Sequence, residues 1–186
     1  MKSISKKVKF AFGSLAIAIG LVGCGQPEIY VNPEYDGAPK WVQVPNVEGK
    51  IAELGSAPKN NMNNVGFQRE LAMANGRNNL AKRLEINVKS MFKSYASQTS
   101  ANGGTMDMTA ESVSKQITKQ SLSGTSQYDA WTSKSGTLYV LMVLDTASVA
   151  KLVEENAKTS FASDEAAYQR VLAAKAQGEL TKELEK

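Results

Sequence analysis

The stretch GTLYVLMVLD, residues 136–145, predicts the strand around which the rest of the fold is arranged. Its alternate positions form two sets that are both apolar, one with Leu138, Val140, Met142 and Leu144 and the other with Tyr139, Leu141 and Val143. Because alternate side chains of a strand point to opposite faces of the sheet, both faces of this strand need to be covered. A strand of that kind is typical of the middle of a sheet, and we expect it there.

Two further stretches supply neighbours for this strand. Residues 123–134 (SGTSQYDAWTSK) predict a second strand, which a tight hairpin turn at Ser135-Gly136 joins to the first. Residues 50–57 (KIAELGSA) predict a short strand of mixed polarity. The sequence therefore indicates a small, mostly antiparallel sheet.

The principal helix is predicted over residues 67–83. Its apolar stripe is formed by Phe67, Leu71, Ala74 and Ala81 at near-helical spacing, with Leu80 and Leu84 flanking the stripe. Gly76 lies in the interior of this helix, where glycine costs about 1 kcal/mol relative to alanine. A compensating reason would be close approach of the helix backbone to a sheet or to a partner helix.

The pattern changes after this helix. Residues 86–94 alternate between two sets of side chains with β-branched and aromatic members, which favours a long strand, although continuation of the helix is a competing interpretation. Residues 97–105 contain Asn102-Gly103-Gly104 and predict a flexible loop. Thr109 is then expected to cap a short helix that ends near Gln120.

The C-terminal part of the chain predicts two more helices. Thr146 is expected to cap the first, and Ser163-Asp164-Glu165 opens the second, which runs to Leu184. We expect this last helix to pack on its own domain or on a neighbouring copy. Together the elements predict an α+β fold, a single compact domain in which helices pack on the small sheet, with an extra C-terminal helix.

The N-terminal residues predict a secretion signal. Four lysines among the first nine residues precede an apolar run over residues 10–22. A helix of about 12 residues covers about 18 Å, which is well short of the hydrocarbon core of about 30 Å, so a permanent membrane span is disfavoured. We expect residues 1–23 to be removed as a signal peptide.

The cleavage site Leu21-Val22-Gly23-Cys24 resembles the lipobox of bacterial lipoproteins. Cleavage between Gly23 and Cys24 leaves a cysteine whose thiolate can be alkylated by diacylglycerol and whose new α-amine can be acylated. Two or three acyl chains form a stable membrane anchor. The alternative is an ordinary secretory signal with a chance cysteine. Because Gly25 and Gln26 replace the aspartate of the commonest inner-membrane retention signal, we expect the outer membrane.

The mature chain is electrically balanced. Removing 23 of 186 residues leaves 163, and removing the four signal lysines from 22 basic side chains leaves 18, which equals the 18 acidic ones. This balance disfavours nucleic acid as a partner, and Lys82-Arg83 is interpreted as a solvated helix face. The chain has no histidine, and its single cysteine, Cys24, is the expected lipid attachment site, so zinc sites, disulfides and Cys-His nucleophiles are excluded. We expect no enzyme activity, no metal and no cofactor.

Two polar stretches lie between the cleavage site and the principal helix. Residues 24–40 are interrupted by prolines and predict a flexible tether, with the folded domain beginning at Trp41. Residues 58–64 contain Asn60, Asn61, Asn63 and Asn64 and predict a turn that also caps the helix. The alternative interpretation of this loop is a sugar-binding lip.

Several segments in order resemble the LPP-twenty type family of small proteobacterial outer-membrane lipoproteins. Residues 37–42 (GAPKWV) are similar to its G-A-P-x-W-V motif, residues 74–81 (ANGRNNLA) to its A-x-A-R-x-x-L-A helix, and residues 137–141 (TLYVL) to its late strand. Gly76 stands where the family usually has alanine. The resemblance covers about residues 20–155 and implies a lipid-anchored α+β domain without established catalysis. It also implies that Arg77 ties the helix to loop carbonyls, and some relatives take part in flagellar assembly or rings.

These observations predict four segments: a signal peptide at residues 1–23, a tether at 24–40, an α+β domain at 41–158 and a C-terminal helix at 159–186. The expected function is a structural, assembly or protein-interaction module of the cell envelope, held at the outer membrane by acyl chains on Cys24. Its expected partners are the membrane, envelope proteins and further copies of the chain. The alternative is a surface lipoprotein that binds a ligand or an adhesion target through Asn60 to Asn64.

Overall fold

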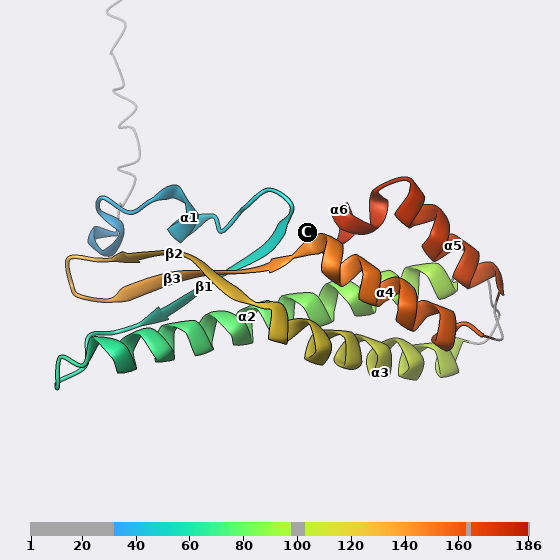
Figure 1. The fold of residues 1–186 in the computed structure, drawn as a ribbon, viewed down its shortest axis with the longest axis horizontal. Coiled ribbons are helices and arrows are strands. Elements are labelled where there is room, and N and C mark those ends of the chain that lie inside the picture. The colour runs from blue at the N-terminus through green and yellow to red at the C-terminus, as the bar shows by residue number, and fades with distance from the viewer. Residues whose placement is uncertain (1–31, 98–102, 163–164, 186) are drawn as a thin grey trace, which may run out of the picture. The chain divides into compact units, whose positions relative to one another are not determined.

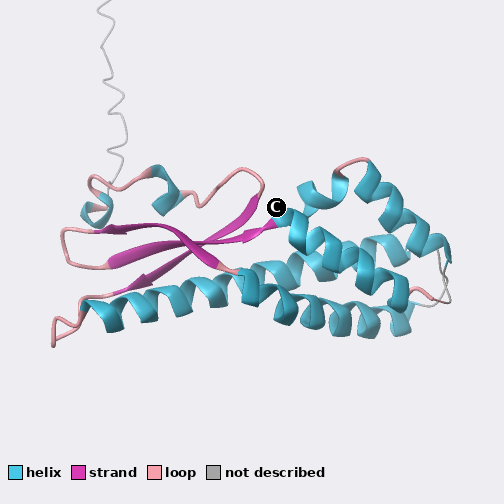
Figure 2. Cartoon of the chain, in the orientation of Figure 1, coloured by secondary structure: helices cyan, strands magenta, loops and turns pink. Residues whose placement is uncertain are grey.

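The structure, a computed structural model, describes residues 32–97, 103–162 and 165–185 (Figure 1). Within these ranges, three strands form one antiparallel sheet: β1 (Lys50–Ala57), β2 (Ser126–Thr132) and β3 (Leu138–Asp145). The strand order is β1-β3-β2, and six of the eight residues of β3 are buried. This confirms the predicted α+β fold, and β3 is the central strand (Figure 2).

The predicted hairpin between β2 and β3 is confirmed. The N–H of Gly136 donates to the carbonyl of Ser133 at 3.0 Å, and the N–H of Ser133 donates to the carbonyl of Thr137 at 2.9 Å. Gly136 has φ +87°, a conformation that favours glycine.

Helix α2 (Val65–Ser97) underlies the sheet and continues beyond it. Its 33 residues span about 50 Å at about 1.5 Å per residue. The strand expected at residues 86–94 is therefore wrong, and the competing helical interpretation holds. Val88, Met91 and Phe92 are buried on the continuing inner face of this helix.

The apolar stripe expected on this helix is also wrong. Phe67 and Leu71 are 57 % and 39 % exposed. The buried face is instead a row at four-residue intervals, formed by Gln68, Ala72, Gly76, Leu80, Leu84 and Val88. The leucines that were expected to flank the stripe therefore lie at its centre.

The expected close approach at Gly76 is present, and its partner is a second glycine. A Cβ atom on Gly55 of β1 would lie 2.0 Å from the carbonyl oxygen of Ala72 and 2.4 Å from the nitrogen of Gly76. A Cβ atom on Gly76 would lie 2.5 Å from Cγ of Met142 in β3. The two glycines thus let the backbone of α2 cross against the sheet.

Beyond the sheet, the second half of α2 packs with α3 (Gly103–Ser121), α5 (Glu165–Ala176) and α6 (Glu179–Glu185), and α4 (Thr146–Ser160) packs on those three helices (Figure 1). Helix α3 begins at Gly103, so Thr109 is inside it rather than at its cap, and the predicted loop loses residues 103–105 to the helix. Asp145, not Thr146, caps α4, because its side chain accepts from the N–H of Ser148 at 2.8 Å.

The single helix predicted from Ser163 to Leu184 is two helices. Helix α5 ends at Ala176, and α6 begins at Glu179 after Gly178, which has φ +69°. The left-handed conformation at this glycine stops α5, and α6 begins after it. The predicted opening residues Ser163 and Asp164 lie outside the described residues.

The other face of the sheet is covered by the segment before β1. It contains a 3-10 helix, η1 (Pro33–Tyr35), and a short helix, α1 (Lys40–Gln43), and Val42 is buried. Trp41 and Val47 pack on Ala52 and Leu141. The predicted tether is therefore wrong for residues 32–40, which fold on the sheet, whereas residues 24–31 lie outside the described part of the chain.

Candidate interaction surface

Four polar side chains at four-residue intervals on α2 form a row that we call the capping row: Asn75, Asn79, Arg83 and Asn87. The amide of Asn75 donates to the carbonyl of Ser56 at 2.9 Å, and the amide of Asn79 donates to that of Leu54 at 2.8 Å. Nη1 of Arg83 donates to the carbonyl of Ala52 at 3.0 Å. Every second carbonyl of β1 thus accepts one hydrogen bond, and the donors lie on successive turns of α2.

The capping row fits β1 because of the two repeat lengths. Four residues of an α-helix advance about 6.0 Å, and two residues of an antiparallel strand advance about 6.8 Å. In an antiparallel pair, every second residue of an edge strand points its carbonyl away from the partner strand. The capping row satisfies these carbonyls and covers this edge of the sheet, so β1 is a poor template for pairing with another strand.

Arg83 also joins the sheet to the C-terminal helices. Its Nη1 lies 3.2 Å from Oε1 of Glu53, and both side chains are 23 % exposed. Its Nη2 donates to the carbonyl of Glu185, and the amide of Asn87 donates to that of Leu184 at 3.2 Å. The last carbonyls of α6 therefore have donors on α2. The predicted solvated face fits Lys82, which is exposed, but is wrong for Arg83.

The opposite edge of the sheet, β2, is interrupted. The pairing of β2 with β3 shifts by one residue between Gln127 and Asp129, as in a β-bulge. Oδ1 of Asp129 accepts from the N–H of Ala130 at 2.7 Å, and its Oδ2 accepts from Nε1 of Trp41 at 2.8 Å. A bulge and a carboxylate on an edge strand both oppose pairing with another chain. Partners of this domain are therefore expected to meet side chains rather than a sheet edge.

Arg77, which the family resemblance assigned to loop carbonyls, has a different acceptor. Its Nε donates to Oγ1 of Thr125 at 3.3 Å, and that hydroxyl donates to the carbonyl of Leu122 at 2.8 Å. Arg69 makes the neighbouring contact, from its Nε to Oε1 of Gln127 at 3.0 Å. The two arginines tie α2 to the start of β2, which is a structural role.

The asparagine-rich loop before α2 is a helix-capping turn, as predicted. Oδ1 of Asn64 accepts from the N–H of Phe67 at 3.0 Å. The side chain of Asn60 accepts from the N–H of Asn64 at 2.8 Å and donates to its carbonyl at 2.7 Å. The side-chain amides of Asn60 and Asn64 therefore form hydrogen bonds within the loop and to the first turn of α2. Asn63 has φ +50°, which asparagine tolerates better than most residues.

One buried polar side chain joins the loop to the hairpin. Nε2 of Gln68 donates to the carbonyl of Ala57 at 3.0 Å and to that of Gly136 at 2.8 Å. Gln68 is only 8 % exposed. Sequence reasoning missed this residue, since a glutamine at the start of a helix usually faces solvent.

Glu34 of η1 binds the same hairpin. Its Oε1 accepts from Oη of Tyr139 at 3.0 Å and from Oγ of Ser135 at 3.1 Å. Hydroxyl groups, chiefly those of Ser133 and Ser135, lower the pKa of Glu34, whereas burial and the Glu34 carboxylate raise the pKa of Tyr139 to about 12. A phenol this weakly acidic stays neutral at physiological pH, so the pair serves to dock the segment on the sheet.

A cleft of about 680 Å³ lies between the second half of α2 and the α5–α6 pair. Its lining mixes both charges with hydroxyl groups and includes Ser90, Tyr95, Arg170, Lys182 and Glu183. Burial, followed by the charges of Glu183 and Glu179, raises the pKa of Tyr95 to about 12.

The described ranges contain no group of three or more His, Cys, Asp or Glu side chains placed to hold a metal ion. Among the helices in those ranges, none is both long and apolar enough to span a bilayer. The predicted lipidation residue Cys24 and the predicted cleavage residue Gly23 lie outside the described residues, so their roles stay predictions.

Comparison with protein families identifies the part of the chain from α1 to β3. The sequence model of the LPP20 lipoprotein family matches residues 39–145, which are more than half of the 186 residues. A search of curated proteins finds no match. The matched segment contains the sheet, the glycine crossing and the capping row, and it agrees with the resemblance carried by residues 37–42, 74–81 and 137–141. The chain belongs to the LPP20 lipoprotein family.

Proposed function

We propose that this lipoprotein is held at the outer membrane by acyl chains on Cys24 and acts as a structural or protein-interaction module of the cell envelope. The observation that carries the proposal is the coincidence of a lipobox at residues 21–24 with a family match that begins 15 residues later, at residue 39. Tethering confines the domain to a surface and raises its effective concentration toward partners and other copies.

The folded domain supports a binding role that uses side chains. Both edges of its sheet are blunted, β1 by the capping row and β2 by the bulge with Asp129. Exposed apolar side chains such as Phe67, Ile86 and Tyr128 provide contact area for other proteins or for lipid. Association with a flagellum, which the resemblance implies for some relatives, is a narrower form of the same proposal.

The test combines fatty-acid labelling with membrane fractionation in the producing bacterium. Labelled palmitate should enter the wild-type protein but not Cys24→Ala, and the wild type should fractionate with the outer membrane. Gly25→Asp is the matched variant, because it keeps the cysteine and restores the usual inner-membrane retention residue. It should stay acylated and move to the inner membrane.

A wild-type protein without label would overturn the anchor. A labelled protein in the inner membrane would overturn the outer-membrane assignment alone. Crosslinking in intact cells then tests the interaction role, for which we expect adducts with envelope proteins or other copies. An acylated protein that gives only uncrosslinked monomer would contradict that role.

A further inference from the structure

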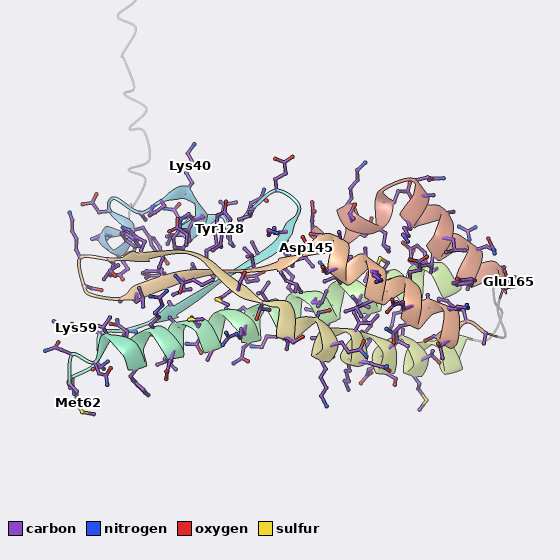
Figure 3. The ribbon with its side chains drawn as sticks, viewed as in Figure 1. Lys40, Lys59, Met62, Tyr128, Asp145 and Glu165 are labelled. Carbon is purple, nitrogen blue, oxygen red and sulfur yellow. The ribbon has the colours of Figure 1, made fainter. Side chains whose placement is uncertain are left out.

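One end of the domain gathers three segments that are distant in the sequence. We call it the turn end, and it consists of residues 33–36, 58–67 and 133–137. Glu34 accepts from Ser135 across it, and the alkyl chain of Lys59 packs over Gly136, whose missing Cβ would lie 3.1 Å from Cδ of that lysine. Figure 3 shows Lys59 and Met62 at this end and Glu165 at the opposite end.

The turn end presents apolar side chains to solvent. Met62 is 89 % exposed, Val65 70 % and Phe67 57 %, and Leu71 follows one turn later on α2. These four are half of the large apolar side chains that are exposed in the described ranges. A folded domain that exposes apolar residues together in this way usually covers them with a partner or a membrane.

The loop holds Met62 in place at this end. The side chain of Asn60, before it, bonds to the backbone N–H and carbonyl of Asn64, after it, and the side chain of Asn64 caps α2. An apolar side chain at the apex of a braced turn is pre-organised for contact, so little conformational entropy is lost when a surface covers it.

The short chain between Cys24 and the domain indicates that the lipid bilayer is the surface that covers the turn end. The eight residue-to-residue steps from Cys24 to Asn32 reach at most about 28 Å when fully extended, and η1, which follows them, belongs to the turn end. Acyl chains on Cys24 therefore keep the turn end, rather than the α5 end, close to the bilayer.

We infer that the turn end docks on the lipid bilayer, with Met62, Val65 and Phe67 entering the headgroup region. This inference rests on the proposed lipid anchor. Because the anchor already supplies a high local concentration of lipid, a weak apolar contact is sufficient to hold the domain in one orientation. The α5 end then faces away from the membrane.

The test uses the mature, acylated protein in vesicles of phosphatidylethanolamine and phosphatidylglycerol. Cys24 is the only cysteine of the chain and its sulfur is alkylated in the anchored form, so Met62→Cys offers a single thiol for an environment-sensitive dye. Glu165→Cys is the matched control at the opposite end. We expect a blue-shifted dye at position 62, quenched several-fold more by brominated acyl chains than the dye at position 165.

A second variant separates docking from anchoring. Val65→Asp with Phe67→Asp, made in the Met62→Cys protein, removes apolar area from the first turn of α2, where acidic residues favour the helix dipole and the fold is expected to survive. The blue shift at position 62 should disappear while the protein still floats with the vesicles.

Three other results would overturn the docking of the turn end on the bilayer. Dyes that stay in water at both positions, on protein that floats with vesicles, would overturn the docking and leave the anchor intact. A blue shift that vanishes when excess lipid dilutes the protein would show that a second copy covers the turn end, and would also overturn the docking. An acylated protein that fails to float with vesicles would overturn both the docking and the proposed anchor.

Discussion

At the scale of single residues, the fold depends on the contact between Gly55 and Gly76. The obstacle that a methyl group would meet differs at the two sites. At Gly55 it is backbone, the carbonyl oxygen of Ala72 at 2.0 Å, whereas at Gly76 it is a side-chain atom, Cγ of Met142 at 2.5 Å. Backbone of a packed helix cannot move without separating α2 from the sheet.

Gly55→Ala should therefore lower the free energy of unfolding by about 3 kcal/mol or more, the upper end of what overpacking costs. Gly76→Ala should cost less, about 1 to 2 kcal/mol, because its methyl group meets a side chain rather than backbone and because alanine favours the helix by about 1 kcal/mol. Urea unfolding measures both. Equal losses, or a larger loss at Gly76, would contradict the account of the crossing.

Glu111 makes stability depend on acid pH. Lys115 and Lys89 lie 2.8 Å and 3.1 Å from its carboxylate oxygens and lower its pKa from 4.5 to about 2. Because the pKa is lower in the folded chain, the stabilisation is complete above pH 4.5 and is lost as the pH falls toward 2.

Unfolding of the wild type and Glu111→Gln should therefore differ most near neutral pH, with the wild type more stable, and should converge as the pH approaches 2. Salt at about 1 M should shrink the difference, since it screens charges beyond about 3 Å. A difference that persists unchanged at pH 2 would mean that packing, not charge, is responsible.

The residue scale shows what the sequence can and cannot predict. The close approach at Gly76 was predictable, because a glycine inside a helix is costly and needs a reason. Its partner Gly55 was not, since a glycine in a strand of mixed polarity fits several roles. Gln68 was missed because its burial depends on two carbonyls, of Ala57 and Gly136, that only the folded chain brings together.

At the scale of elements, the capping row relates α2 to β1. Asn79→Ala removes the donor for the carbonyl of Leu54 and should destabilise the domain by about 1 to 2 kcal/mol. Asn78→Ala is the control, because Asn78 is the exposed neighbour on the same helix and should change stability by less than about 0.5 kcal/mol.

Asn79→Asp is a sharper variant, since it places a carboxylate against a carbonyl oxygen. It should destabilise more than Asn79→Ala, as measured by urea unfolding at neutral pH. If Asn79→Ala and Asn78→Ala had the same effect, the bond to Leu54 would contribute nothing measurable.

The mistaken strand at residues 86–94 has a physical explanation. A four-residue repeat also satisfies a two-residue period, so Val88 and Phe92 fit one face of a strand as well as they fit the inner face of α2. The leucines at 80 and 84 continue the same repeat backwards into the helix. The helix is favoured because this row is buried in the folded chain, and the local sequence pattern does not show that burial.

At the scale of the whole molecule, the family match and the core do not end at the same place. The match stops at residue 145, but α5 and α6 contribute Val171, Leu180 and Leu184, each at most 1 % exposed. Leu184 and Glu185 also supply acceptors for the capping row. The C-terminal helices are therefore part of the folded domain, although the sequence predicted only that a helix would pack here or on another copy.

A chain that ends at Ala162 should show what these helices contribute. The truncation removes three buried aliphatic side chains, whose burial contributes about 1.5 to 3 kcal/mol each, and exposes the apolar surface that they cover. It should therefore lower the free energy of unfolding by more than about 3 kcal/mol or drive the protein into oligomers. Urea unfolding and sedimentation velocity measure these results. An unchanged monomer with full-length stability would mean that α5 and α6 pack on the domain without stabilising it.

The account as a whole depends on acylation of Cys24, and intact mass spectrometry of protein purified from bacterial envelopes tests it most directly. We predict a chain that begins at Cys24 and carries the added mass of a diacylglycerol, with or without an amide-linked acyl chain. A mature chain whose Cys24 carries no lipid, or a precursor that still begins at Met1, would contradict the account.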